Sequence, residues 1–110
     1  MNHKVTLSRK LSSLFKDENL RKDVVELLEN YGKGNHEQEV PRVRLAVLKL
    51  ANTDINEIIK CVGKAKQDYR DILAWAEYPR QSKKWSMPDG SKKKTLIEAD
   101  RVEYEEWLNT

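Results

Sequence analysis

Residues 54–78 carry the most regular apolar pattern in the chain. Apolar, aromatic or small side chains recur there at alternating steps of three and four residues: Ile55, Ile58, Val62, Ala65, Tyr69, Ile72 and Ala76. This spacing puts one such side chain per turn on one helix face and is typical of a heptad seam. It predicts one long helix over 54–78. The helix packs either in the protein's own core or, as the strict spacing favours, against a second copy of the chain.

A second apolar segment, residues 41–51, comes directly before this run. Its apolar side chains cover much of the helix circumference: Val43, Leu45, Ala46, Val47, Leu48 and Leu50. Pro41 suits the first turn of a helix, and Asp54 is a suitable N-cap for the next one. Only residues 52–53 separate the segments, and so short a connection makes two helices antiparallel neighbours.

Two shorter amphipathic patterns begin the chain. Within residues 5–16, one stripe holds Leu7, Leu11, Leu14 and Phe15, and the opposite face holds Arg9, Lys10, Ser12 and Ser13. Such a basic amphipathic start occurs in membrane-surface and transit segments, but we expect a first helix packed on the core. A second stripe starts afresh after Asp17 with Leu20, Val24, Leu27, Leu28 and Tyr31. Asp17 caps this helix, and Gly32 ends it in a left-handed conformation.

The C-terminal third consists of two oppositely charged segments. Residues 79–94 hold six Lys and Arg residues and one Asp, and residues 95–110 hold five Asp and Glu residues and one Arg. Pro88-Asp89-Gly90 is a turn sequence, so we expect a basic loop or a small hairpin that pairs 84–87 with 91–95. Thr95 and Glu98 have capping-box spacing, which predicts a short acidic helix from there on.

Composition narrows the class of protein. The chain has 110 residues, which is one domain, and the longest unbroken apolar run, Ile72 to Ala76, is far too short to cross a membrane. Cys61 is the only cysteine, so neither an internal disulfide nor a cysteine-based metal cage can form. We expect a cytoplasmic protein without cofactor or metal.

Charged and aromatic residues gather around the second half of the 54–78 run. We predict a partner-binding surface made by Asp68, Arg70, Asp71, Trp75, Glu77, Tyr78 and Arg80. Asp71 and Glu77 would serve as an acid–base pair only if a pocket shifted one of their pKa values. Solvated ion pairs are the expected role of such charges, so we predict no catalytic residue and no enzyme activity.

The segment after this helix suggests a different partner. Its cations surround a tryptophan, in a set formed by Lys83, Lys84, Trp85, Lys92, Lys93 and Lys94. Stacking on an indole and neutralisation of phosphates are how proteins hold single-stranded nucleic acid. The competing interpretation is that this segment folds back onto the acidic C-terminal helix, which would nearly cancel its charge.

The phrase DYRDILAWAEYPR, from Asp68 to Arg80, resembles the centre of a family of small uncharacterised bacterial proteins. With its lead-in, the resemblance covers about a third of the chain and includes no motif of known chemistry. It implies a bacterial, cytosolic protein with an accessory role, and it brings no activity and no functional residues.

Together these patterns predict one all-α domain over 1–110, a small bundle of four to five helices. It is built around an antiparallel pair at about 41–51 and 54–78, and residues 79–110 form a mobile C-terminal extension. The predicted function is a non-enzymatic interaction module that forms a homodimer, binds a protein partner and has no membrane role. The alternative is a nucleic-acid-binding accessory protein that uses the basic segment 80–94.

Overall fold

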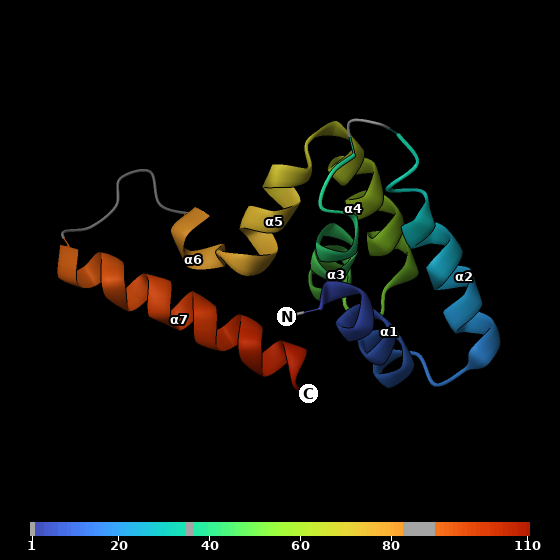
Figure 1. Cartoon of the computed structure of the whole chain (residues 1–110), viewed down its shortest axis with the longest axis horizontal. Helices are drawn as coiled ribbons and strands as arrows, with labels where there is room; N and C mark the ends of the chain where they lie inside the picture. Colours follow the sequence, from blue (N-terminus) through green and yellow to red (C-terminus); the bar gives the residue numbers. More distant parts are fainter. Residues whose placement is uncertain (1, 35–36, 83–89) are drawn as a thin grey trace.

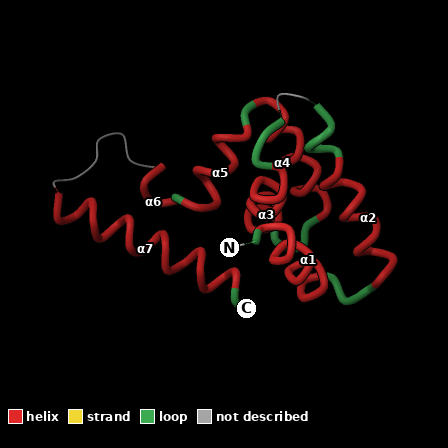
Figure 2. Tube along the Cα trace, viewed as in Figure 1, coloured by secondary structure: helices red, strands yellow, loops and turns green. Residues whose placement is uncertain are grey.

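The computed structural model of the chain describes residues 2–34, 37–82 and 90–110. For residues 81, 82 and 90–95 it describes the backbone only. The helices are α1 His3–Leu14, α2 Glu18–Glu29, α3 Val40–Ala51, α4 Ile55–Gln67, α5 Tyr69–Glu77, α6 Pro79–Ser82 and α7 Gly90–Leu108. The described part of the chain consists of helices and loops (Figure 2), so the predicted all-α class is confirmed.

Helix α3 is the centre of the bundle. It packs against α1, α4 and α5, and Figure 1 shows it enclosed by these helices. Six of its side chains are buried: Val43, Leu45, Ala46, Val47, Leu48 and Ala51. A helix that is apolar around most of its circumference needs neighbours on several sides, and α3 has them. The predicted pair of α3 with the following helix is therefore present.

The predicted helix starts are also confirmed. The Asp17 carboxylate accepts hydrogen bonds from the backbone N–H groups of Asn19 and Leu20, which begins α2. Asp54 does the same at α4, and Pro41 lies in the first turn of α3. Gly32 has a φ of 114°, so a side chain at this position would be strained and the loop after α2 requires glycine.

The predicted single helix over 54–78 is wrong, because the chain breaks at Asp68 into α4 and α5. Asp68 has extended backbone angles (φ −156°, ψ 101°), and its carboxylate accepts hydrogen bonds from the backbone N–H and the side chain of Arg70. An aspartate whose carboxylate accepts a hydrogen bond from the backbone N–H two residues later favours the start of a helix over its interior. The apolar periodicity continues across the break, so the sequence pattern does not reveal it.

The heptad seam itself lies inside the protein's own core. Ile58, Val62, Ala65, Ile72 and Ala76 are buried, and Ile55 and Tyr69 are partly buried against them. A second copy of the chain therefore cannot pack on this seam while the fold is intact.

The predicted boundaries of the C-terminal segments also need correction. Residues 79–82 form the short helix α6, and α7 begins at Gly90. Ser91–Thr95, expected as a hairpin strand, is thus helical, and Thr95 lies inside the helix instead of capping it. The sequence from Ser91 onward contains neither Pro nor Gly and is rich in Lys and Glu, which favour helix. The other half of the hairpin, 84–87, and the turn at 88–89 lie outside the described residues.

Lys10 was expected on the exposed face of the first helix but is buried, with 1% of its surface accessible. Its Nζ donates to the carbonyl oxygen of Trp107 at 2.8 Å and lies 4.2 Å from the centroid of the Trp107 ring. Arg9 donates to the carbonyl oxygen of Leu108. The C-terminal end of α7 thus covers part of the α1 face that holds Arg9 and Lys10, which the sequence pattern of α1 predicts to be polar and exposed. Cations suit the unpaired carbonyls at a helix C-terminus.

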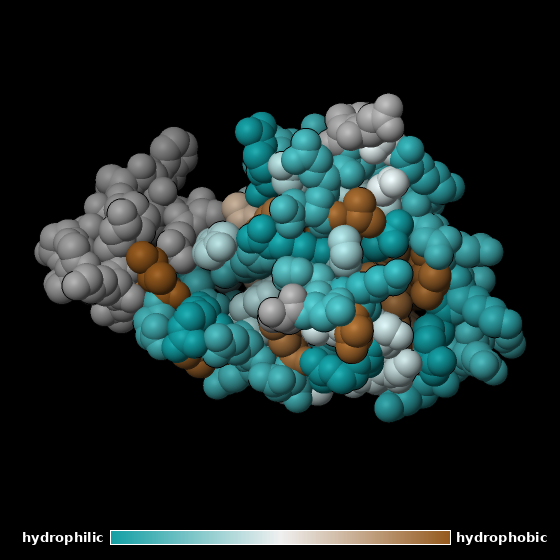
Figure 3. All heavy atoms as spheres, viewed as in Figure 1, coloured by the Kyte–Doolittle hydropathy of each residue, from teal (hydrophilic) through white to brown (hydrophobic). Residues whose placement is uncertain are grey.

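Hydrophilic residues cover most of the described surface on the face seen in Figure 3, and apolar residues form separate small patches. Within the described part of the chain, the exposed large apolar side chains are Val5, Leu20, Ile59, Trp75, Tyr78, Ile97 and Val102. None of the described helices combines the length and hydropathy that a membrane-crossing segment needs.

Candidate functional site

The structure distributes the predicted partner-binding residues over several places instead of one surface. Asp68 and Arg70 lie at the break between α4 and α5, and Asp71 is exposed on α5. Trp75 lies in a hollow beside α7. Glu77 and Tyr78 line a different cleft. None of the pockets formed by the described residues named below is lined by both Asp71 and Glu77, so these pockets bring together no acid–base pair from the two residues.

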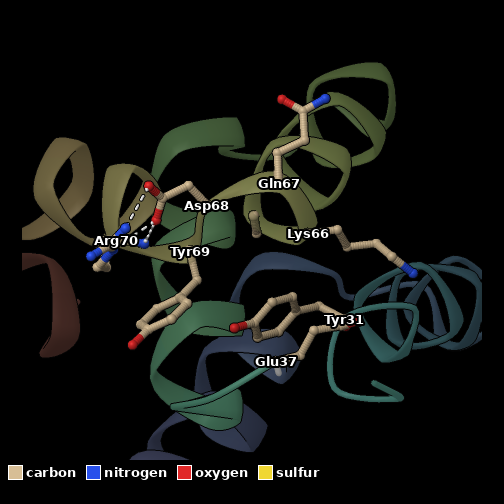
Figure 4. Close-up of a pocket in the computed structure, with 8 residues that line it drawn as sticks. Tyr31, Glu37, Lys66, Gln67, Asp68, Tyr69 and Arg70 are labelled. Carbon is tan, nitrogen blue, oxygen red and sulfur yellow. Dashed lines mark hydrogen bonds and ion pairs between the residues drawn. The ribbon is translucent and has the colours of Figure 1, made fainter. Parts of the chain in front are cut away.

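The pocket at the break has a volume of about 240 Å³ and is lined by Tyr31, Glu37, Asp68, Tyr69 and Arg70, among others (Figure 4). Two of its polar side chains, Tyr31 and Glu37, form hydrogen bonds with the backbone of the loop that follows α2. The Tyr31 hydroxyl donates to the carbonyl oxygen of Gln38 at 2.6 Å, and Glu37 accepts from the Gly32 N–H at 2.7 Å. Burial, together with the charge of Glu37, raises the pKa of Tyr31 to about 12.

A chain of ion pairs joins α3, α5 and α7. Arg42 donates to both carboxylate oxygens of Glu77, at 2.8 and 2.5 Å, and this pair raises the pKa of Arg42. Lys49 donates to the carbonyl oxygen of Ala76 at 2.6 Å and to Glu103 at 3.0 Å. With both oxygens of Glu77 engaged by Arg42, this carboxylate is a structural ion-pair partner.

Asp100 on α7 is fully buried and secures α6. Its Oδ1 accepts from the backbone N–H of Arg80 at 3.2 Å and from the Arg80 guanidinium at 3.1 Å. The same guanidinium lies 3.6 Å from Glu103. Arg80 is therefore engaged by two acidic residues of α7, as the interpretation that this segment folds back onto the acidic helix requires.

The cleft next to this network has a volume of about 500 Å³ and lies where α1, α3, α5 and α7 meet. Tyr78, Ile97, Tyr104 and Leu108 give it apolar walls. The Tyr104 hydroxyl is buried and has no hydrogen-bond partner among the described residues. Burial, and the negative charge of Glu77, raise the pKa of this phenol.

The hollow on the other side of α7 has a volume of about 630 Å³. Leu50 of α3, Trp75 of α5, Pro79 of α6 and Trp107 of α7 line it. Trp75 is 42% exposed, which is unusual for the largest apolar side chain. The Lys64 ammonium lies 5.7 Å from the centroid of the Trp75 ring. Among the described tryptophans, Trp75 is exposed and Trp107 is partly buried, whereas Tyr78, in the cleft on the other side of α7, is exposed to a similar extent as Trp75.

The residues predicted to bind nucleic acid are only partly visible. Lys83, Lys84 and Trp85 lie outside the described residues. The backbone of Lys92, Lys93 and Lys94 forms the first turns of α7, and their side chains are not described.

Sequence reasoning did not identify Arg42 and Tyr104 as site residues. The available signal is the presence of Arg42 and Arg44 on a helix that is apolar around most of its circumference, because charges on such a helix need partners from neighbouring segments. Among the described residues, no group of His, Cys, Asp and Glu is arranged to hold a metal ion.

Comparison with known proteins assigns neither a family nor a function to the chain. No family model matches the sequence, and no curated protein or solved structure shows significant similarity to it. The resemblance carried by Asp68–Arg80 thus stays a resemblance, and function must be inferred from the surface of the molecule.

Proposed function

We propose that the protein is a non-enzymatic interaction module that binds a protein partner through the hollow at Trp75. The observation that supports this most is the exposure of Trp75, 42%, within a hollow of about 630 Å³. Tryptophan carries a large share of the binding energy in many protein interfaces, chiefly where it lies in a pocket that excludes water.

The walls of the hollow favour binding because they are already held in place. Lys49 is attached to the Ala76 carbonyl and to Glu103, and Lys10 holds the α7 end that carries Trp107. A partner would insert an apolar side chain beside Trp75 without ordering the walls, which lowers the entropic cost of association.

Self-association through this hollow is part of the proposal. Because the heptad seam is buried within one chain, a homodimer would use outer surfaces, and Trp75 is the first candidate. We also propose a cytosolic location. The single thiol, Cys61, is partly buried, and burial raises its pKa, which lowers the fraction of reactive thiolate near neutral pH.

The test places a photo-crosslinking amino acid at position 75 in the organism that produces the protein. Lys60 on α4, whose side chain is 74% exposed, is the matched control position. We expect specific adducts from position 75 that are absent from position 60. Sedimentation velocity of the purified chain then tells whether the partner is a second copy. Identical adducts from both positions, or none from position 75, would refute the proposal.

Nucleic acid is the second candidate partner. Residues 79–94 carry six Lys and Arg residues against one Asp, and this local excess supports binding to phosphates. The engagement of Arg80 by Asp100 and Glu103 weakens the case. Titration with labelled single-stranded nucleic acid should show affinity that falls with salt and is lost when the five lysines of this segment become Gln. Absence of binding at low salt would exclude this candidate.

A further inference from the structure

A groove of about 580 Å³ runs between α2 and α4, at the opposite end of the molecule from α7 (Figure 1). Its apolar lining comes from Leu27 on α2 and from Ile55 and Ile59 on α4. Ile59 is 51% exposed. It lies at the edge of the apolar face of α4, whose other residues Ile58, Val62 and Ala65 are buried. Together with the partly buried Leu27 and Ile55, this exposed side chain gives the groove a continuous apolar lining that another molecule can cover.

Acidic residues form the rim of the groove. Asp23, Glu26 and Glu29 line it from α2, and Lys33 is the one cation among its lining residues. None of the three carboxylates forms an ion pair or a side-chain hydrogen bond with a described residue. Glu77 on α5 and Asp100 and Glu103 on α7 differ in this respect, since all three are paired. Asp71 and Glu106 are exposed and form no such pair with a described residue. The groove is thus locally acidic on a chain whose net charge is +3.

We propose that this groove binds a basic amphipathic helix of a partner protein. The lining residues on α4 lie four positions apart, so the apolar lining extends along the helices, and a ligand helix with apolar residues at steps of three and four would match it. Lysines or arginines beside that apolar stripe would meet Asp23, Glu26 and Glu29. This surface is separate from the hollow at Trp75, so the inference does not depend on the function proposed there.

The probe is a designed helical peptide of about 15 residues, the length at which an isolated helix becomes marginally stable. It carries leucines at steps of three and four and lysines elsewhere. A second peptide has the same leucines with glutamates in place of the lysines. Fluorescence anisotropy with the full chain, at low and at physiological salt, measures both affinities. We expect saturable binding of the lysine peptide that weakens with salt, and no binding of the glutamate peptide.

Two variants locate the site. Asp23→Asn with Glu26→Gln should weaken binding of the lysine peptide about tenfold or more at low salt, because two charge contacts are lost. The control, Asp71→Asn with Glu106→Gln, makes the same charge change at exposed positions elsewhere and should keep the affinity. Ile59→Ala should weaken binding at both salt concentrations. All these side chains are exposed, and circular dichroism verifies folding.

Three results would overturn the inference. They are the absence of saturable binding of the lysine peptide at any salt concentration, equal affinity of the groove variant and the control variant, and equal affinity of the two peptides.

Discussion

The Tyr104 hydroxyl is buried without a hydrogen-bond partner among the described residues, so its removal should stabilise the fold. A buried polar group that lacks a partner costs roughly 1–3 kcal/mol, because it has given up its hydrogen bonds to water. Phenylalanine keeps the ring, its packing against Trp107 (ring centroids 6.0 Å apart) and its place in the cleft. Tyr104→Phe should therefore raise the free energy of unfolding by about 1–2 kcal/mol.

Tyr31 offers a matched control within the same chain. Its hydroxyl is also buried but donates to the carbonyl oxygen of Gln38 at 2.6 Å. Tyr31→Phe leaves that carbonyl without this donor, and it should lower the free energy of unfolding by about 1–2 kcal/mol. The same chemical change thus has opposite signs at two positions, solely because one hydroxyl has a partner.

Guanidinium unfolding followed by circular dichroism measures both variants. In a domain of this size, 1 kcal/mol corresponds to roughly 4 °C or more in Tm, so thermal unfolding checks the result independently. Unchanged m-values would show that the variants change stability and not the compactness of the unfolded chain. If Tyr104→Phe destabilises the protein as much as Tyr31→Phe does, the Tyr104 hydroxyl has a hydrogen-bond partner, bound water included, and the reasoning fails.

Three further predictions concern the ionisable groups. Glu77→Gln removes the charge that pairs with Arg42, and it should cost about 2–3 kcal/mol in chemical unfolding, an effect that Arg42→Met in the same chain should largely cancel. Lys10→Met keeps the packing but removes the cation at the end of α7, so hydrogen exchange should accelerate in α7 and stay unchanged in α3. Burial raises the pKa of Tyr31 from 10.0 to about 12, so between these pH values the folded chain keeps a proton that the unfolded chain loses. The free energy of unfolding should therefore fall as the pH rises from about 10 to about 12. Unfolding titrations across this range should show a smaller fall for Tyr31→Phe, and an equal fall would contradict the assignment.

Much of the fold follows from local sequence rules. The helix class, the central position of α3 and the caps at Asp17 and Asp54 depend on side-chain spacing and on hydrogen bonds within a few residues. Such features need no knowledge of distant segments, so periodicity and capping preferences predict them well.

The candidate surfaces were less predictable from sequence. Trp75 and Tyr78 are exposed as expected, but Glu77 is buried against Arg42, which lies 35 residues earlier in the chain. The acidic rim of the α2–α4 groove was not identified, because Asp23 and Glu26 resemble any solvated helix face until α4 is placed beside them.

The sequence alone determined most of the apolar side chains that turn inward along α1 to α5, since that depends on the fixed rotation per residue. Only the tertiary structure decided that the apolar run 54–78 breaks into two helices and which charges pair. Asp68 interrupts the helix without disturbing its apolar period, and Lys10 is buried only because α7 returns to cover α1. The physical reason is that a charged side chain can be buried only when a distant segment supplies a partner for it. An apolar side chain is buried by the hydrophobic effect, which needs no specific partner.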